Sequence, residues 1–218
     1  LITWLLVNEP LKLWGFFFGL VVASVWMVGR QIKKWNFVLV LLVIAGAVIA
    51  YFLTSLPPLS AEKTYWFLLL SGFIAICAMI LPGISGSFIL LMLGSYQMIM
   101  YSLKNLNIVD ILVFGTGCIL GLLSFSRVLK WLFKKFEYGT LAVLTGFLIG
   151  SLNKIWPWKE NLQLLYTHSD GRQEFLQSNI VPSQHADPQM IWVIGCAIFG
   201  AAVILGLEWY GGRKKQEA

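Results

Sequence analysis

The chain has 218 residues, of which 58% are hydrophobic and only 12% are charged, and its mean hydropathy is +0.78. Several stretches approach the roughly 20 apolar residues that cross a bilayer core. The 16 basic residues outnumber the 10 acidic ones, but they cluster in short segments between apolar runs. This pattern is typical of the cytoplasmic loops of membrane proteins and argues against nucleic-acid binding. We therefore predict an all-α polytopic integral membrane protein.

The first part of the chain predicts two complete spans. Residues 1–7 look like the tail of a preceding span, and full spans are expected at about 11–28 and 37–53. The basic segment between these two spans should lie in the cytoplasm, and the segment 54–64, nearly free of positive charge, should lie outside. Because the chain opens within an apolar run and without an initiator Met, we expect an upstream part to be missing.

Six small or turn-forming residues, from Pro82 to Ser87, separate two further apolar runs. Pro82 disfavours helix at the preceding residue, so a helix over 65–80 should end there and another should continue over 88–103. Ser85 or Ser87 can cap the second helix, whose unpaired N–H groups would point back into the break. Non-helical backbone at membrane depth is tolerated only where it is buried in protein or lines a polar cavity. The break is therefore the first place to look for a ligand.

The basic segments 30–36 and 127–138 should both be cytoplasmic, and one span separates each of them from the two helices around the break. These two helices must therefore return the chain to the side of the membrane where they started. Each arm has about 16 residues, roughly 24 Å of helix against a hydrocarbon core of ~30 Å. We favour a re-entrant hairpin over 65–103 and leave open two full crossings with the break at the cytoplasmic face.

Three more spans complete the predicted single transmembrane domain of residues 1–218, at about 111–125, 140–152 and 190–210. The basic segment 127–138 is expected to be a cytoplasmic loop, and the polar segment 156–188 an extracytoplasmic loop with aromatic anchors. Glycines at four-residue spacing predict close packing of helices inside the protein. These pairs are Gly15 and Gly19, Gly117 and Gly121, and Gly146 and Gly150.

The helix start at 86–89 combines backbone N–H donors, the positive end of a helix dipole and two hydroxyls, and such an arrangement suits an anion, above all a phosphate. A kink that merely packs against a neighbouring helix is the competing interpretation.

Arg127 could make a bidentate phosphate contact or act as a positive-inside anchor. Gln97 could donate to a head group or pack as an interfacial amide. Lys104 and Lys154, each at the end of a span, have the same two interpretations. Lys159 and Arg172 either belong to an external loop or contact the substrate.

Enzymatic chemistry is disfavoured by what the sequence lacks. Acidic residues lie only at span edges, so no mid-membrane carboxylate is evident. His168 and His185 lack metal-ligand spacing, and no nucleophile, base and acid occur in a catalytic pattern. The three cysteines lie far apart inside apolar runs and are interpreted as core-filling residues. We therefore expect neither a cofactor nor a bound metal.

The sequence resembles the bacterial polyprenyl-phosphate transporters. The resemblance rests on AICAMILPGISGSFILLMLGSY at 75–96, with support from FFFGL at 16–20, FSRVLKWLFKK at 125–135 and LTGFLIGSLNKIWPW at 144–158. It covers most of the chain. Members of this family resemble inverted-repeat transporters with two Pro-Gly-x-Ser-Gly hairpins, of which this chain has only the second. The first would lie upstream of residue 1.

The resemblance implies a transporter that returns undecaprenyl phosphate, or a similar polyprenyl phosphate, across the bacterial cytoplasmic membrane for cell-envelope synthesis. It implies that the phosphate is bound by Gly83, Ser85, Gly86, Ser87 and Arg127. A charge role at Gln97 does not carry over. Coupling to a proton or sodium, transport direction and oligomeric state stay open. The alternatives from the residues alone are an anion channel, a small-anion carrier and a non-transporting scaffold.

Overall fold

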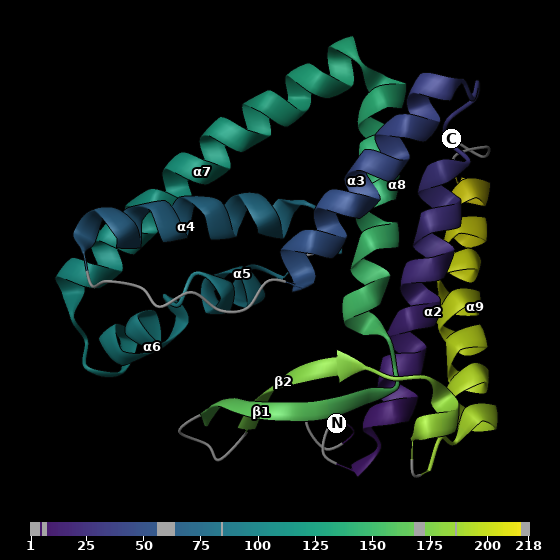
Figure 1. The fold of residues 1–218 in the computed structure, drawn as a ribbon. Helices are drawn as coiled ribbons and strands as arrows, with labels where there is room; N and C mark the ends of the chain where they lie inside the picture. The colour runs from purple at the N-terminus through teal and green to yellow at the C-terminus, as the bar shows by residue number, and fades with distance from the viewer. Residues whose placement is uncertain are drawn as a thin grey trace. The chain divides into compact units, whose positions relative to one another are not determined.

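The computed structural model describes residues 5, 8–55, 64–83, 85–167, 173–185 and 187–214 (Figure 1). Helices dominate, with one antiparallel hairpin of two strands near the end. The elements are α2 (Pro10–Gly29), α3 (Phe37–Ser55), α4 (Tyr65–Ile80), α5 (Gly86–Met92), α6 (Tyr96–Lys104), α7 (Ile108–Lys135), α8 (Glu137–Ile155), β1 (Lys159–Thr167), β2 (Gln173–Asn179), a 3-10 helix (Pro182–Gln184) and α9 (Met190–Lys214).

Among the described residues, four helices are long and apolar enough to cross a membrane, namely α2, α3, α7 and α9. The consecutive helices α5 and α6 would make a fifth span if they count as one, but they are bent by 109°. The predicted all-α polytopic architecture is confirmed, and so is the end of α4 at Ile80. The proposed tail of a preceding span at 1–7 lies almost entirely outside the described residues, as does the centre of the 54–64 loop.

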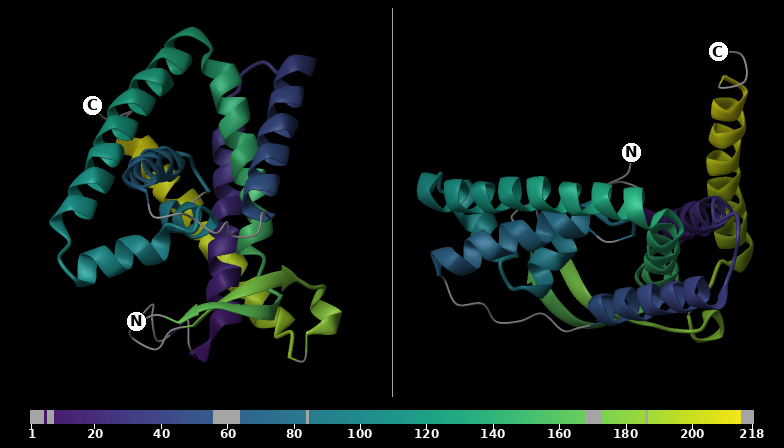
Figure 2. Two further views of the ribbon diagram at one scale, coloured as in Figure 1. Left: turned by 60° about the vertical axis from the view of Figure 1, so that its left-hand side comes forward. Right: turned by 90° about the horizontal axis from the view of Figure 1, so that it is seen from above.

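The contacts divide the chain into two compact units, each considered by itself. One unit is Val28–Ser151, and the other combines the described residues up to Met27 with those from Leu152 onward. In the first unit, α3 and α8 lie side by side, as Figures 1 and 2 both show. The break between α4 and α5 lies against this pair, because Ala78 and Ile89 share a buried cluster with Ala50 of α3 and Phe147 of α8.

Glycines allow three pairs of helices to approach closely, and in each pair the two helices run parallel. On α7, Gly117 faces the backbone of Leu69 and Gly121 faces that of Phe73, one turn further along α4. Gly146 and Gly150 of α8 face α3 in the same way, and Gly15 and Gly19 of α2 face α9 in the other unit. The predicted packing role of all three glycine pairs is confirmed. The parallel run of α4 and α7 also shows that the intervening segment returns to the starting end of α4. Its path relative to the membrane stays a prediction.

The structure differs from the expected loops in two places. The basic residues of 127–135 do not form a loop, because α7 continues through them to Lys135 and covers 28 residues in place of the predicted 15 or so. Leucine, lysine and phenylalanine are good or tolerated helix formers, and no glycine or proline interrupts this stretch. The polar segment 156–188 contains a β-hairpin rather than only loop, with Lys159 opposite Asn179.

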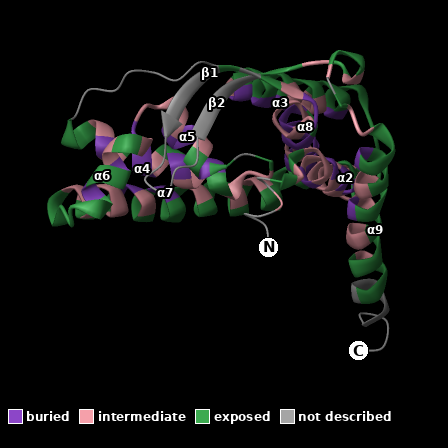
Figure 3. Cartoon of the chain, turned by 90° about the horizontal axis from the view of Figure 1, so that it is seen from below, coloured by how far each residue is buried: buried purple, intermediate pink, exposed green. Residues whose placement is uncertain are grey.

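Exposed apolar side chains cover much of the helices that are long and apolar enough to cross a membrane. Only 11% of the apolar window of α7 is buried within the protein, and the same fraction holds for α9. Exposed residues accordingly run along much of both helices in Figure 3. In a membrane, hydrocarbon solvates such surfaces, so this exposure carries no hydrophobic penalty.

Candidate functional site

The break between α4 and α5 is built by residues that cannot continue a helix. The last turn of α4 closes on Leu81, whose backbone is extended with φ −75° and ψ 130°. Pro82 follows, and Gly83 then takes a φ of +87°, which lies in the left-handed region that side chains with a Cβ disfavour. Ile84 lies outside the described residues. The chain resumes as helix at Gly86, with Ser85 in the N-cap position.

One side of the break is packed tightly against the protein. A Cβ on Gly83 would overlap the side chain of Ser151 on α8. Ser151 is fully buried, and its hydroxyl donates to the carbonyl of Leu148 at 2.8 Å. Gly86 is also buried, and a Cβ there would lie 3.1 Å from the carbonyl oxygen of Ala75. Close approach and backbone conformation therefore both select glycine at position 83, and a tight contact favours it at position 86.

The other side of the break presents two hydroxyls. Ser85 and Ser87 are both exposed, and their Oγ atoms lie 2.8 Å apart. Neither caps the helix through its side chain in the way we expected, since Ser85 occupies the N-cap without a side-chain cap bond. A hydroxyl has one hydrogen to donate, so one serine donates to the other, and the second keeps its hydrogen for an outside acceptor. The backbone N–H groups in the first turn of a helix have no hydrogen-bond acceptor within that helix. The arrangement can hold an anionic oxygen.

A second break divides the helix that we predicted over 88–103. The structure has α5 and α6 there, joined by Gly94 with a φ of +70° and by Ser95, which is completely buried. The Oγ of Ser95 lies 2.6 Å from that of Ser71 on α4. Ser71 donates its own hydrogen to the carbonyl of Phe67, so Ser95 must be the donor in the pair. A glycine followed by a serine was the sequence signal for this bend, and our prediction overlooked it.

Gln97 lies beyond this second break. It is an exposed residue in the first turn of α6 rather than the middle of a continuous second arm. The bend of 109° between α5 and α6 therefore separates it from the helix start at Gly86. Lys104 is exposed in the last turn of the same helix. The role of Gln97 as a substrate contact remains a prediction.

Arg127 lies on α7, exposed and within the helix rather than at the end of a span. The last glycine contact between α7 and α4 is at Gly121, which faces Phe73 and Ile76. Past this point α7 diverges from α4, as Figure 1 shows. The described contacts thus place Ser151 of α8, and not Arg127, against the break.

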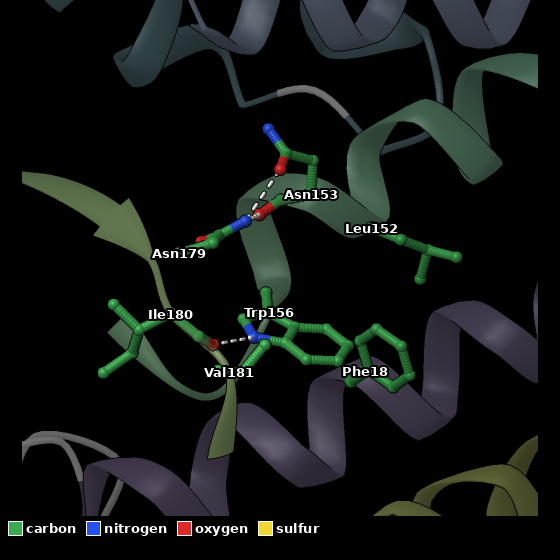
Figure 4. A pocket seen from close by; sticks show the side chains of 7 residues that line it. All are labelled: Phe18, Leu152, Asn153, Trp156, Asn179, Ile180 and Val181. Carbon is green, nitrogen blue, oxygen red and sulfur yellow. Dashed lines mark hydrogen bonds between the residues drawn. The ribbon is translucent and has the colours of Figure 1, made fainter. Parts of the chain in front are cut away.

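The other unit contains a cavity of about 390 Å³, and none of the predicted phosphate-binding residues lines it (Figure 4). Its lining is formed by Phe18, Leu152, Asn153, Trp156, Asn179, Ile180 and Val181. The amide of Asn179 donates to both the carbonyl and the side-chain oxygen of Asn153 at 2.7 Å. The indole of Trp156 donates to the carbonyl of Ile180 at 3.0 Å. These bonds attach the hairpin to the end of α8. The packing of these elements therefore explains the cavity without a ligand.

Lys159, at the start of β1, is held by contacts within this unit. Its Nζ donates to the carbonyl of Lys154 at 2.6 Å and lies 4.1 Å from the ring centroid of Trp14. Both contacts favour the ammonium form. Burial opposes them and, with the nearby charge of Lys154, lowers the pKa of Lys159 from 10.5 to about 8. Its substrate role, which we left open, is less favoured than this packing role. Arg172 lies outside the described residues.

The lowered pKa of Lys159 predicts a pH dependence of stability. Between pH 8 and 10.5 the unfolded chain binds more protons at this amine than the folded one does, so stability rises with pH across that window. The gain is at most on the order of 3 kcal/mol. Thermal unfolding of the wild type and of Lys159→Met at pH 7, 8, 9 and 10 measures it as the difference between the two slopes. Parallel slopes would contradict the assignment.

The described residues contain no group of three or more His, Cys, Asp or Glu side chains that could hold a metal ion. Cys77 and Cys118 are half-buried rather than fully buried, and their thiols lie 3.8 Å and 3.5 Å from the carbonyls of Gly121 and Gly72. They contribute to the α4 and α7 interface, which agrees with a packing role.

Comparison with known proteins gives the family. Residues 1–173 match a family described as undecaprenyl phosphate translocase-like. The chain belongs to this family. The resemblance seen in the sequence is thereby confirmed, and the matched range includes the break, Gln97 and Arg127.

Two relatives support the family assignment. The chain is 47% identical over 216 residues to a polyprenyl-phosphate transporter of Vibrio cholerae serotype O1, and the alignment covers 96% of this chain and 70% of the relative. It is 32% identical over 94 residues to a polyprenyl-phosphate transporter of Staphylococcus aureus, covering 40% of this chain and 33% of that relative. The family and its named members are transporters rather than enzymes. No solved structure shows significant similarity to the chain.

Proposed function

We propose that this protein transports undecaprenyl phosphate, or a similar polyprenyl phosphate, across the bacterial cytoplasmic membrane and so recycles the lipid carrier of cell-envelope synthesis. The observation that carries the proposal is the exposed hydroxyl pair of Ser85 and Ser87, at a break in the membrane helices of a chain 47% identical to a polyprenyl-phosphate transporter. We place the phosphate at Gly83, Ser85, Gly86 and Ser87. The prenyl tail stays in lipid.

The physical problem for such a transporter is the charged head group, because an isolated anion in hydrocarbon is strongly disfavoured. Hydroxyls and backbone N–H groups at a helix start offset part of this cost without adding a cation. The packing of Gly83 against Ser151 and of Gly86 against Ala75 holds the break in place while its serine side faces outward. A fixed donor array needs little reorganisation when the phosphate arrives.

Arg127 and Gln97 stand differently in this proposal. Both are exposed, but neither belongs to the segment that builds the break. We propose that Arg127 contacts the phosphate as the phosphate approaches the break, and that Gln97 makes a weaker contact with the substrate. Substituting Arg127 should then weaken transport less than substituting both serines.

The test is transport by the full-length protein in proteoliposomes loaded with a polyprenyl phosphate. We expect Ser85→Ala/Ser87→Ala to lower the initial rate by about tenfold or more, since each lost bond to a charged group is worth roughly 1.5–3 kcal/mol. Ser126→Ala is the matched control, because the exposed hydroxyl of Ser126 donates to the carbonyl of Leu123 in its own helix. Wild-type rates in the double variant would contradict the proposed site.

Two further outcomes would redirect the functional assignment. Conduction of inorganic anions without any lipid substrate would favour a channel. A scaffold would be favoured by two results together: the wild-type protein shows no transport, and cells that carry only the double serine variant function normally. Either result would contradict the transporter proposal itself and not only its site.

A further inference from the structure

One end of the Val28–Ser151 unit gathers cations and aromatic rings from two separate segments. We call it the basic aromatic face, and it consists of residues 30–37 and 127–136. Its cations are Arg30, Lys33, Lys34, Arg127, Lys130, Lys134 and Lys135, and Glu137 is the one acid that directly adjoins them in sequence. Its rings are Trp35, Phe37, Trp131, Phe133 and Phe136, and all five are exposed.

Packing brings the two segments to the same end of the unit. Ile32, in the first segment, is buried with Leu39 of α3 and with Leu141 and Ala142 of α8. Tyr138, in the first turn of α8, packs against the same cluster. Because α8 begins directly after α7 and runs parallel to α3, the end of α7 and the start of α3 lie at the same end of the α3 and α8 pair, as Figure 1 shows. A prediction of two separate cytoplasmic loops could not show this.

The helical continuation of α7 shapes the second segment. A helix of this length extends roughly 42 Å, which exceeds a hydrocarbon core of ~30 Å. The cations of its last turns place that end, where the helix exceeds the core, at the head groups or in water. Lys130 and Lys134 are four residues apart and lie on one side of the helix. The Nζ of Lys135 lies 5.5 Å from the ring centroids of both Trp131 and Phe136. The end of α7 is therefore ordered as a helix that presents its charges together.

We propose that the basic aromatic face binds the head groups of anionic phospholipids. Clusters of four or more Lys and Arg next to a membrane helix attract such lipids. The exposed rings favour a bilayer over an acidic protein as the occupant, because Trp and other amphipathic rings settle at the head-group level. Phe37 is 78% exposed and Trp131 is 53% exposed, and this exposure indicates that the two rings lie at the interface between water and hydrocarbon. Apart from Arg127, the face consists of residues that the proposed phosphate site does not use.

The test uses the full-length protein in phosphatidylcholine bilayers with a trace of spin-labelled lipid. The measured quantity is the association constant of phosphatidylglycerol relative to that of phosphatidylcholine. We expect a ratio above one at low salt that falls toward one in ~1 M salt, where the Debye length is about 3 Å. A ratio of one for the wild type at low salt would overturn the proposal.

Matched double variants separate the face from net charge. Lys33→Gln/Lys134→Gln removes two cations of the face, and Lys12→Gln/Lys104→Gln removes two elsewhere. Each cation near an anionic surface changes affinity by roughly fivefold, so the first variant should lower the ratio toward one and the second should retain it. Equal ratios in the two variants would overturn the proposal. So would binding of poly-glutamate by this face without any preference for phosphatidylglycerol.

Discussion

Gly117→Leu should separate α7 from α4 and destabilise the protein by about 3 kcal/mol, the upper end of the usual cost of overpacking. Even a Cβ at this position would overlap the backbone carbonyl of Leu69, so no change of rotamer can accommodate the larger side chain. A shift of one helix would also disturb the contact of Gly121 with Phe73, one turn further on. The measurement is the thermal unfolding midpoint in detergent, followed by intrinsic fluorescence.

Gly115→Leu is the matched control on the same helix. A Cβ on Gly115 has nothing within 4 Å, so the leucine would face the hydrocarbon. We expect its unfolding midpoint to stay near the wild-type value or to rise, because leucine favours helix more than glycine does. Similar losses in both variants would contradict the assignment of Gly117, and not Gly115, to the interface.

Gly83→Ala should impair both stability and transport, through two separate costs. A residue with a Cβ at the φ of +87° costs about 1–2 kcal/mol, and overlap with the buried Ser151 adds roughly 1–3 kcal/mol. The substitution therefore moves the break relative to α8 and with it the serine pair. Unfolding midpoints and transport rates of the variant measure the two effects.

Ser151→Gly provides the test of the second cost. Removing this side chain leaves room for the new methyl group, so Gly83→Ala should cost less in the Ser151→Gly background than in the wild type. The remaining loss then reports backbone conformation alone. An unchanged cost of Gly83→Ala in both backgrounds would show that Ser151 does not support the break.

Helix ends and close contacts were predictable where one residue determines them. Pro82 and the glycines beside it predicted the end of α4 at Ile80, and the structure agrees to the residue. Glycine pairs at four-residue spacing predicted the helix seams because a close approach in lipid leaves few other choices. The family also followed from a short and specific stretch, residues 75–96.

The remaining features depend on tertiary contacts that a single sequence does not display. The bend at Gly94 is completed by the hydrogen bond between Ser95 and Ser71, which are 24 residues apart. Ser151 gives no local signal of its contact with Gly83. The basic end of α7 fits both the positive-inside rule and the propensity for helix. The positive-inside rule predicts only which side of the membrane a segment faces, and not whether the segment is a loop or a helix.

The decisive measurement is binding of undecaprenyl phosphate to the purified full-length protein, with the uncharged polyprenol as the comparison lipid. We expect binding to require the phosphate, to weaken by about tenfold or more in Ser85→Ala/Ser87→Ala, to weaken less in Arg127→Ala and to stay unchanged in Ser126→Ala. Equal affinity for the uncharged lipid, or an unchanged affinity in the double serine variant, would contradict a phosphate site at the break.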